Sequence, residues 1–89
     1  MSSMRLVSGS NSVRPLSSLR EGTHGRVVDV RADDGGRAER LAALGVTPGA
    51  LVTVMQTFPG VVFLCDQTEL AVERGVAAAI LIRPVEIGS

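Results

Sequence analysis

Hydrophobic and polar residues alternate through most of the second half of the chain, which is the spacing of β-strands. The alternation is strictest in LVTVMQ, residues 51–56. An earlier stretch, HGRVVDVRA at residues 24–32, predicts a strand with Val28 and Val30 on one face. Short apolar runs bounded by turn residues predict three more strands, over residues 61–66, 69–73 and 79–83.

A helical spacing precedes residues 51–56. Leu41 and Leu44 lie three positions apart, which predicts a short helix with one narrow apolar stripe. Gly45 stands where a helix ends in the left-handed conformation, and Val46 follows at the position that packs back onto Leu41. The next residues, Thr-Pro-Gly, predict a type II turn into the strand.

Five short strands with one short inserted α-helix predict a mainly β fold, a small SH3-like barrel. We expect Leu41, Leu44 and Val46 to fold over the mouth of this barrel. The helix would then close one end of the sheet and leave no cavity in which a reaction could run.

The C-terminal segment allows two interpretations. The first is one helical turn over residues 74–78 followed by the last strand, whose pairing Pro84 would end. The second is a continuous helix over VERGVAAAILIR, residues 72–83. The interruption at Gly75 and the β-branched residues near Ile82 favour the turn and strand.

The composition indicates one small globular domain of 89 residues, with 45% hydrophobic and 20% charged residues. Residues 1–14 are rich in serine and are expected to form a disordered leader before a domain at residues 15–86. No apolar run reaches the length of about 18 residues that a membrane span needs, so we expect no membrane insertion. A single cysteine and no signal-peptide pattern make the cytoplasm the expected location.

Two motifs together resemble a known family. The first is RLAALGVTPGALVTV, in which Arg-Leu is followed by Leu-Gly, an aliphatic residue and Pro-Gly; the second is LAVERGVAAAILI. With an upstream pattern of leucines, glycines and valines, they resemble the FeoA-like family, the small ferrous iron transport protein A, over residues 15–84. The residues that carry the resemblance are Leu16, Leu19, Gly22, Gly25, Val27, Val28, Val30, Arg40, Leu41, Leu44, Gly45, Val46, Pro48, Gly49, Leu70, Ala71, Val72, Arg74, Ala77, Ile80 and Ile82.

The resemblance implies an SH3-like barrel with an inserted helix, in agreement with the residue pattern. It implies a cytoplasmic accessory protein of bacterial ferrous iron uptake, whose partner is FeoB, a membrane permease with a GTPase domain. The same fold occurs as the C-terminal domain of metal-dependent repressors. This chain departs from the family in its short loop at residues 57–60, which alters any surface that docks there.

Few residues are candidates for metal binding, redox chemistry or catalysis. Cys65 shares strand parity with the apolar residues 61 and 63, which favours a buried hydrophobic role over a metal or redox role. His24 could bind iron with Asp29 or with Asp33-Asp34, but a solvated loop position is the expected one. The sequence offers no set of three or four imidazole or thiolate ligands. It also offers no nucleophile with a nearby base and no phosphate-binding glycine loop, so we expect no enzyme and no cofactor beyond weakly bound Fe²⁺ or another transition metal.

Apolar residues on the outer strand faces suggest contact with another protein. Only one parity of strand 61–66 can face the interior, so Val62 and Leu64 should lie outside, as should Leu81 and Met55. If contiguous, they would form a docking or self-association surface; otherwise the helix or the N-terminal segment covers them. Unpaired edge strands would also permit a homo-oligomer.

Three functions follow, in order of preference. The first is a non-catalytic interaction module that docks on the FeoB GTPase-permease. The second is a stand-alone metal-sensing domain, related to the SH3-like domain of iron-dependent repressors and using His24, Cys65 and acidic groups. Nucleic-acid binding comes last and is not expected, because the net charge is zero and the two aromatics leave little to stack on bases.

Overall fold

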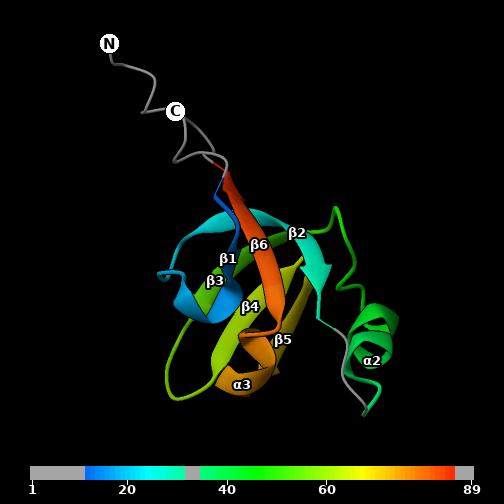
Figure 1. Ribbon diagram of the computed structural model, residues 1–89. Coiled ribbons are helices and arrows are strands. Elements are labelled where there is room, and N and C mark those ends of the chain that lie inside the picture. The colour runs from blue at the N-terminus through cyan, green and yellow to red at the C-terminus, as the bar shows by residue number, and fades with distance from the viewer. Residues whose placement is uncertain (1–11, 32–34, 86–89) are drawn as a thin grey trace.

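The structure, a computed structural model, describes residues 12–31 and 35–85. Figure 1 shows a strand-rich body with short helices at its periphery. In chain order the elements are β1 (Arg14–Pro15), the 3-10 turn η2 (Leu16–Ser18), β2 (His24–Val30), α2 (Arg37–Ala43), β3 (Leu51–Gln56), β4 (Val61–Cys65), β5 (Thr68–Val72), α3 (Arg74–Ala77) and β6 (Ile80–Val85). Most bounds differ from the predicted ones by one or two residues, which is the usual uncertainty of element ends.

The strands form one six-stranded antiparallel sheet in the order β1-β6-β2-β3-β4-β5. The prediction of a mainly β fold with short helices is therefore confirmed. The strand that the sequence did not predict is β1, where Arg14 pairs with Ile82. Residue 14 thus belongs to the sheet rather than to a disordered leader, and residues 1–11 lie outside the described residues.

Alternate strand residues meet in one aliphatic core, because successive side chains of a strand point to opposite faces. Leu16 and Leu19 are both buried and belong to this core. Within residues 12–31 and 35–85, no polar or charged side chain is buried. The buried cluster consists of Leu16, Leu19, Val27, Leu41, Val46, Val52, Val54, Val61, Phe63, Cys65, Ala77, Ile80 and Ile82.

The inward face of β2 differs from the prediction. Val27 is buried and Val28 is only half-buried, although Val28 was expected to share a face with Val30. The pairing with β6 shifts between Val27 and Asp29, so a bulge at this point inserts one residue. A bulge reverses the parity of everything beyond it, which is why Val27 and Val30 both pack against the core.

The helix α2 ends as the sequence predicted. Gly45 has a φ of 97°, and its N–H donates to the carbonyl oxygen of Ala42 at 3.0 Å. The N–H of Val46 donates to the carbonyl oxygen of Leu41 at 2.9 Å, which completes a Schellman motif. Leu41 and Val46 are both buried, so this motif fastens the helix onto the barrel core.

Leu44 does not join them. Its side chain is 53% exposed, so the prediction that Leu41 and Leu44 pack together was wrong. Leu44 is the C-cap residue, with φ −95° and ψ 3°, and no longer follows the helical turn. The backbone leaves the helical path at this residue, so the Leu44 side chain points into solvent.

Substitution of Gly45 by alanine should cost about 1–2 kcal/mol of folding free energy, because a Cβ is strained in the left-handed region. A Cβ at this position would meet no atom within 4 Å, so backbone strain is the whole expected effect. Gly45→Asn should lose less, since asparagine tolerates this conformation. Urea denaturation of the three proteins measures the difference, and equal stability of Gly45→Ala and the wild type would contradict the capping role.

The C-terminal segment is a helical turn followed by a strand, as the first interpretation predicted. The turn is α3, and β6 begins after the N–H of Ala79 bonds to the carbonyl oxygen of Val76 at 3.0 Å. A continuous helix through this segment is excluded. Pro84, however, does not end the pairing, because it lies within β6 opposite Gly25. A proline is tolerated here because β6 is nearing its end and its neighbour β1 is only two residues long.

Candidate functional site

The outer face of β3 and β4 carries most of the apolar residues expected to bind a partner. Val62 and Leu64 alternate with the buried Val61, Phe63 and Cys65, as predicted, and are half-buried. Val62 pairs with Gln56 on one side and Ala71 on the other. Leu64 lies between Thr53 and Glu69, and so has polar neighbours on both sides.

Met55 reaches the surface through a second bulge. The pairing of β3 with β4 shifts between Val54 and Gln56, which leaves Met55 as the extra residue. A bulge redirects a side chain that a regular strand would keep within the ladder. Met55 is 47% exposed and lies at the end of β3, directly before the β3–β4 loop.

The β3–β4 loop adds an aromatic residue that the sequence interpretation had treated only as a turn position. Phe58 is 75% exposed, the highest exposure among the large apolar residues that the structure describes. Arg74 links this loop to the 3-10 turn η2, because its guanidinium donates hydrogen bonds to the carbonyl oxygens of Thr57 and Ser17. We call Met55, Phe58, Pro59 and Val62, which pairs with Gln56, the β3–β4 loop surface.

Leu81 does not belong to this surface. It lies on β6, which β2 and β3 separate from β4 in the sheet order. Its pairing partners are Asp29 and Pro15, and it is half-buried among them. Of the four residues expected to bind a partner, Met55 thus lies next to Gln56, the pairing partner of Val62, and Leu64 lies two residues further along β4. Leu81 lies apart from them.

Cys65 lies in the core, as the strand parity predicted. Its side chain is 2% exposed, and its Sγ–H points at the carbonyl oxygen of Gly45 at 3.4 Å. Burial, and secondarily the negative charge of Asp66, raises the pKa of the Cys65 thiol above its usual value. The hydrogen bond of the thiol joins the turn after α2 to β4.

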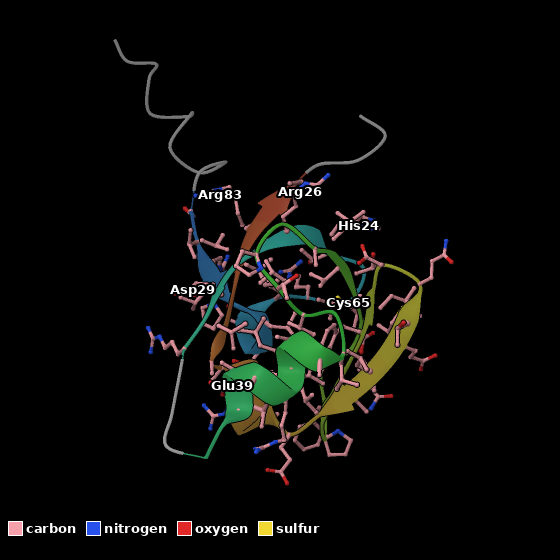
Figure 2. The ribbon with its side chains drawn as sticks, turned by 90° about the vertical axis from the view of Figure 1, so that its right-hand side faces the viewer. His24, Arg26, Asp29, Glu39, Cys65 and Arg83 are labelled. Atoms are coloured by element: carbon pink, nitrogen blue, oxygen red, sulfur yellow. The ribbon has the colours of Figure 1, made fainter. Side chains whose placement is uncertain are left out.

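His24 is a strand residue and not the solvated loop residue that was expected. It begins β2, is half-buried, and places its Nδ1 2.9 Å from Oγ1 of Thr53. Asp29 is five residues further along the same strand, about 16 Å away at the usual strand rise. Figure 2 accordingly shows His24 and Asp29 on opposite sides of the view, so the two cannot share one metal ion.

The structure also does not support a metal site in which Cys65 and His24 are both ligands. His24 precedes the inward-facing Gly25 and lies on the outer face of the sheet, whereas the Cys65 thiol faces the core. No group of three or more histidine, cysteine or acidic residues close enough to hold a metal ion occurs in the part of the chain that the structure describes. Asp33 and Asp34 lie outside the described residues, so their predicted role is untested.

Comparison with known proteins places this geometry in a family. The model of the FeoA domain matches residues 14–84, which is most of the chain and coincides with the sheet from β1 to β6. The chain belongs to the FeoA domain family. This FeoA domain is accordingly a non-catalytic accessory domain linked to ferrous iron transport.

Solved structures agree with this assignment. An iron uptake regulatory protein (FeoA) is 28% identical, with a TM-score of 0.74, and the match covers 83% of this chain and 100% of that one. FeoA of Stenotrophomonas maltophilia, described as a prokaryotic SH3 domain protein in complex with zinc, is 22% identical with a TM-score of 0.69 and coverages of 75% and 86%. The SH3-like fold is therefore confirmed.

The fold also occurs outside ferrous iron transport. A manganese-dependent transcriptional repressor matches 84% of this chain with a TM-score of 0.77 at 19% identity, but the match spans only 43% of the repressor. That likeness concerns the fold alone. A comparison with curated protein sequences gives no match. No helix within the described ranges is long and apolar enough to cross a bilayer.

Proposed function

We propose that this FeoA domain is a cytoplasmic accessory protein of ferrous iron uptake that docks on a FeoB-type GTPase-permease through the β3–β4 loop surface. The observation that carries the proposal is the exposure of Phe58, at 75%, three residues after the exposed Met55. Exposed aromatic and methionine side chains are enriched at the centres of protein interfaces. Family membership supplies the link to the ferrous iron system.

The loop is suited to docking because it is already held in place. Arg74 binds the carbonyl oxygens of Thr57 and Ser17 and so ties the loop to the base of the barrel. A pre-organised loop loses little conformational entropy when a partner covers it. Docking would favour whichever state of the permease presents the complementary pocket, and so shift the balance of its states.

Calorimetric titration against the cytosolic domain of the permease, nucleotide-free and nucleotide-bound, tests the proposal. Phe58→Ser should weaken binding by at least about tenfold, since an aromatic interface anchor is typically worth 2 kcal/mol or more. Leu44→Ser is the matched control, because Leu44 is also an exposed apolar residue, at 53%, but lies at the end of α2. Its affinity should equal that of the wild type. No binding at about tens of micromolar in either nucleotide state, or equal losses in both variants, would contradict docking at this surface.

The alternative of a metal-sensing domain has less support. It requires His24 and Cys65 as ligands. The Cys65 side chain is buried in the core and its thiol donates a hydrogen bond to the carbonyl oxygen of Gly45, whereas His24 lies on the outer face of the sheet beside Thr53. The manganese-dependent repressor shares the fold at an identity too low to carry a binding function over. We therefore prefer the docking role.

A further inference from the structure

The sheet has two edge strands, and they differ in how open they are to a further strand. At one edge, β1 is only two residues long and includes Pro15, which has no N–H to donate. At the other edge, β5 spans five residues, contains no proline and keeps a regular register along β4. Proteins usually protect such an edge with a proline, a bulge or an inward-pointing charge. Figure 2 shows the yellow arrow of β5 along the right-hand side of the molecule, and within the described ranges β5 pairs with β4 alone.

The hydrogen-bonding groups that face outward from β5 follow from the bonds of its neighbours. The N–H of Asp66 donates to the carbonyl oxygen of Leu51 at 2.9 Å, so the even-numbered positions at the end of β4 bond toward β3. Bonding groups alternate between the two sides of a strand, so the odd-numbered residues of β4 bond to β5, where they pair with even-numbered residues. Glu69 and Ala71 therefore direct their N–H and C=O groups to the open edge.

A second copy of β5 fits this edge in one register. Antiparallel pairing about a two-fold axis at Leu70 places Glu69 opposite Ala71 of the other copy, and symmetry repeats this pair. Each pair exchanges an N–H···O bond in both directions. Moving the axis by one residue in either direction instead pairs Glu69 with Glu69 or with Glu73 of the other copy. Like charges directly opposite each other are destabilising, so charge selects the register centred on Leu70.

The same register also suits the inward face of the sheet. Leu70 and Val72 are only half-buried, although both pack against the core cluster. In the paired form, the Leu70 side chains of the two copies lie next to each other, and Val72 lies opposite Thr68. Pairing thus covers the open flank of the core with apolar groups from the second copy.

We propose that the open edge of β5 binds a second copy of this chain, which gives a two-fold dimer with one continuous sheet. One pair of five-residue strands buries less than the roughly 1,200–2,000 Å² of a standard interface, so the dimer is weak. We expect a dissociation constant of about 0.1–1 mM. The dimer does not depend on docking to the permease, and its test contains no permease.

Sedimentation equilibrium of the full chain and amide hydrogen exchange of the ¹⁵N-labelled chain test the proposal. Between about 1 mM and about 50 µM, dilution should convert dimer into monomer. Exchange at the amides of Glu69 and Ala71 should become faster on dilution, because their N–H groups lose the second copy. Exchange at Leu70 should change less, since its N–H already bonds to β4.

Charge substitutions at Ala71 test the register. Glu69 and Ala71 are both exposed, so these substitutions should leave the fold intact. Ala71→Glu should weaken association by at least about threefold, because it repels Glu69 of the other copy twice, and Ala71→Lys should strengthen it by a similar factor. Adding Glu69→Lys to Ala71→Glu places opposite charges face to face and should restore association. Ala43→Glu is the matched control, since Ala43 is an exposed alanine on α2 and the change in net charge is the same.

Four results would overturn the proposal. They are a chain that stays monomeric at about 1 mM, equal effects of Ala71→Glu and Ala43→Glu, no restoration by Glu69→Lys, and amide protection at Glu69 and Ala71 that dilution does not change. The last result would show that another part of the same chain covers the edge.

Discussion

Phe63→Ala should lower the free energy of unfolding by about 3–5 kcal/mol, the usual range for truncating a buried aromatic side chain. Phe63 is fully buried and is the largest such side chain in the described core. It lies on β4 between Val54 of β3 and Leu70 of β5, where few neighbours could collapse into the space it leaves. Small domains have total stabilities near the lower end of about 5–15 kcal/mol. Much of the variant should therefore be unfolded at 37 °C.

The chain's other phenylalanine is the matched control for this substitution. Phe58 is 75% exposed in the β3–β4 loop, so Phe58→Ala should change the stability by less than about 0.5 kcal/mol. Urea denaturation followed by circular dichroism compares the two variants with the wild type. If both lost the same stability, Phe58 would be packed rather than available to a partner, and the docking surface would lose its main support.

The second large effect is expected at Gly25, where β2 crosses close to β6. A Cβ on Gly25 would overlap Cγ2 of Ile82 and lie 2.9 Å from the carbonyl oxygen of Arg83. Ile82 is fully buried and the carbonyl belongs to the β6 backbone, so neither can move without disturbing the sheet. Gly25→Ala should cost about 1–3 kcal/mol or more, the usual range for overpacking.

Gly75→Ala is the control for the Gly25 substitution. The same methyl group would meet no atom within 4 Å at Gly75, which lies within α3. Alanine is favoured over glycine in helices by about 1 kcal/mol, so this variant should be as stable as the wild type or more stable. Thermal melting of both variants gives the comparison. A neutral Gly25→Ala would show that β2 and β6 can separate without cost.

Features that depend on neighbouring residues could be predicted from the sequence. The Gly45 helix end, with Val46 folded back onto Leu41, is determined by a few consecutive residues and is confirmed. The inward positions of β4, including Cys65, follow from a regular alternation and are also confirmed. The turn at α3 followed because Gly75 weakens a helix while β-branched residues favour a strand.

Features that depend on pairing between distant segments could not be predicted. The bulges beside Val28 and Met55 are set by the register with β6 and β4, which no local pattern encodes. The strand β1 exists only because Arg14 finds an unpaired edge of β6. Leu81 was grouped with Val62 by parity alone, although the strand order separates them.

The exposure of Phe58 was missed for a related reason. A turn position gives no signal of the direction in which its side chain points. The signal that could have found it is compositional, since the chain has two phenylalanines and no other aromatic residue. Phe63 fills the core. Phe58 lies in a four-residue loop, and aromatic residues in loops are candidates for contact with a partner.

The most direct test of the docking role is a chemical-shift map of the ¹⁵N-labelled chain mixed with the cytosolic domain of the permease. We expect the largest changes on the amides of residues 55–58 and Gly60, on Val62 and on Ala71 of the neighbouring strand. The amides of Gly75 and Ala78, in and after α3, should change little. Changes centred on α2 or on Leu81, with residues 55–60 unaffected, would contradict it.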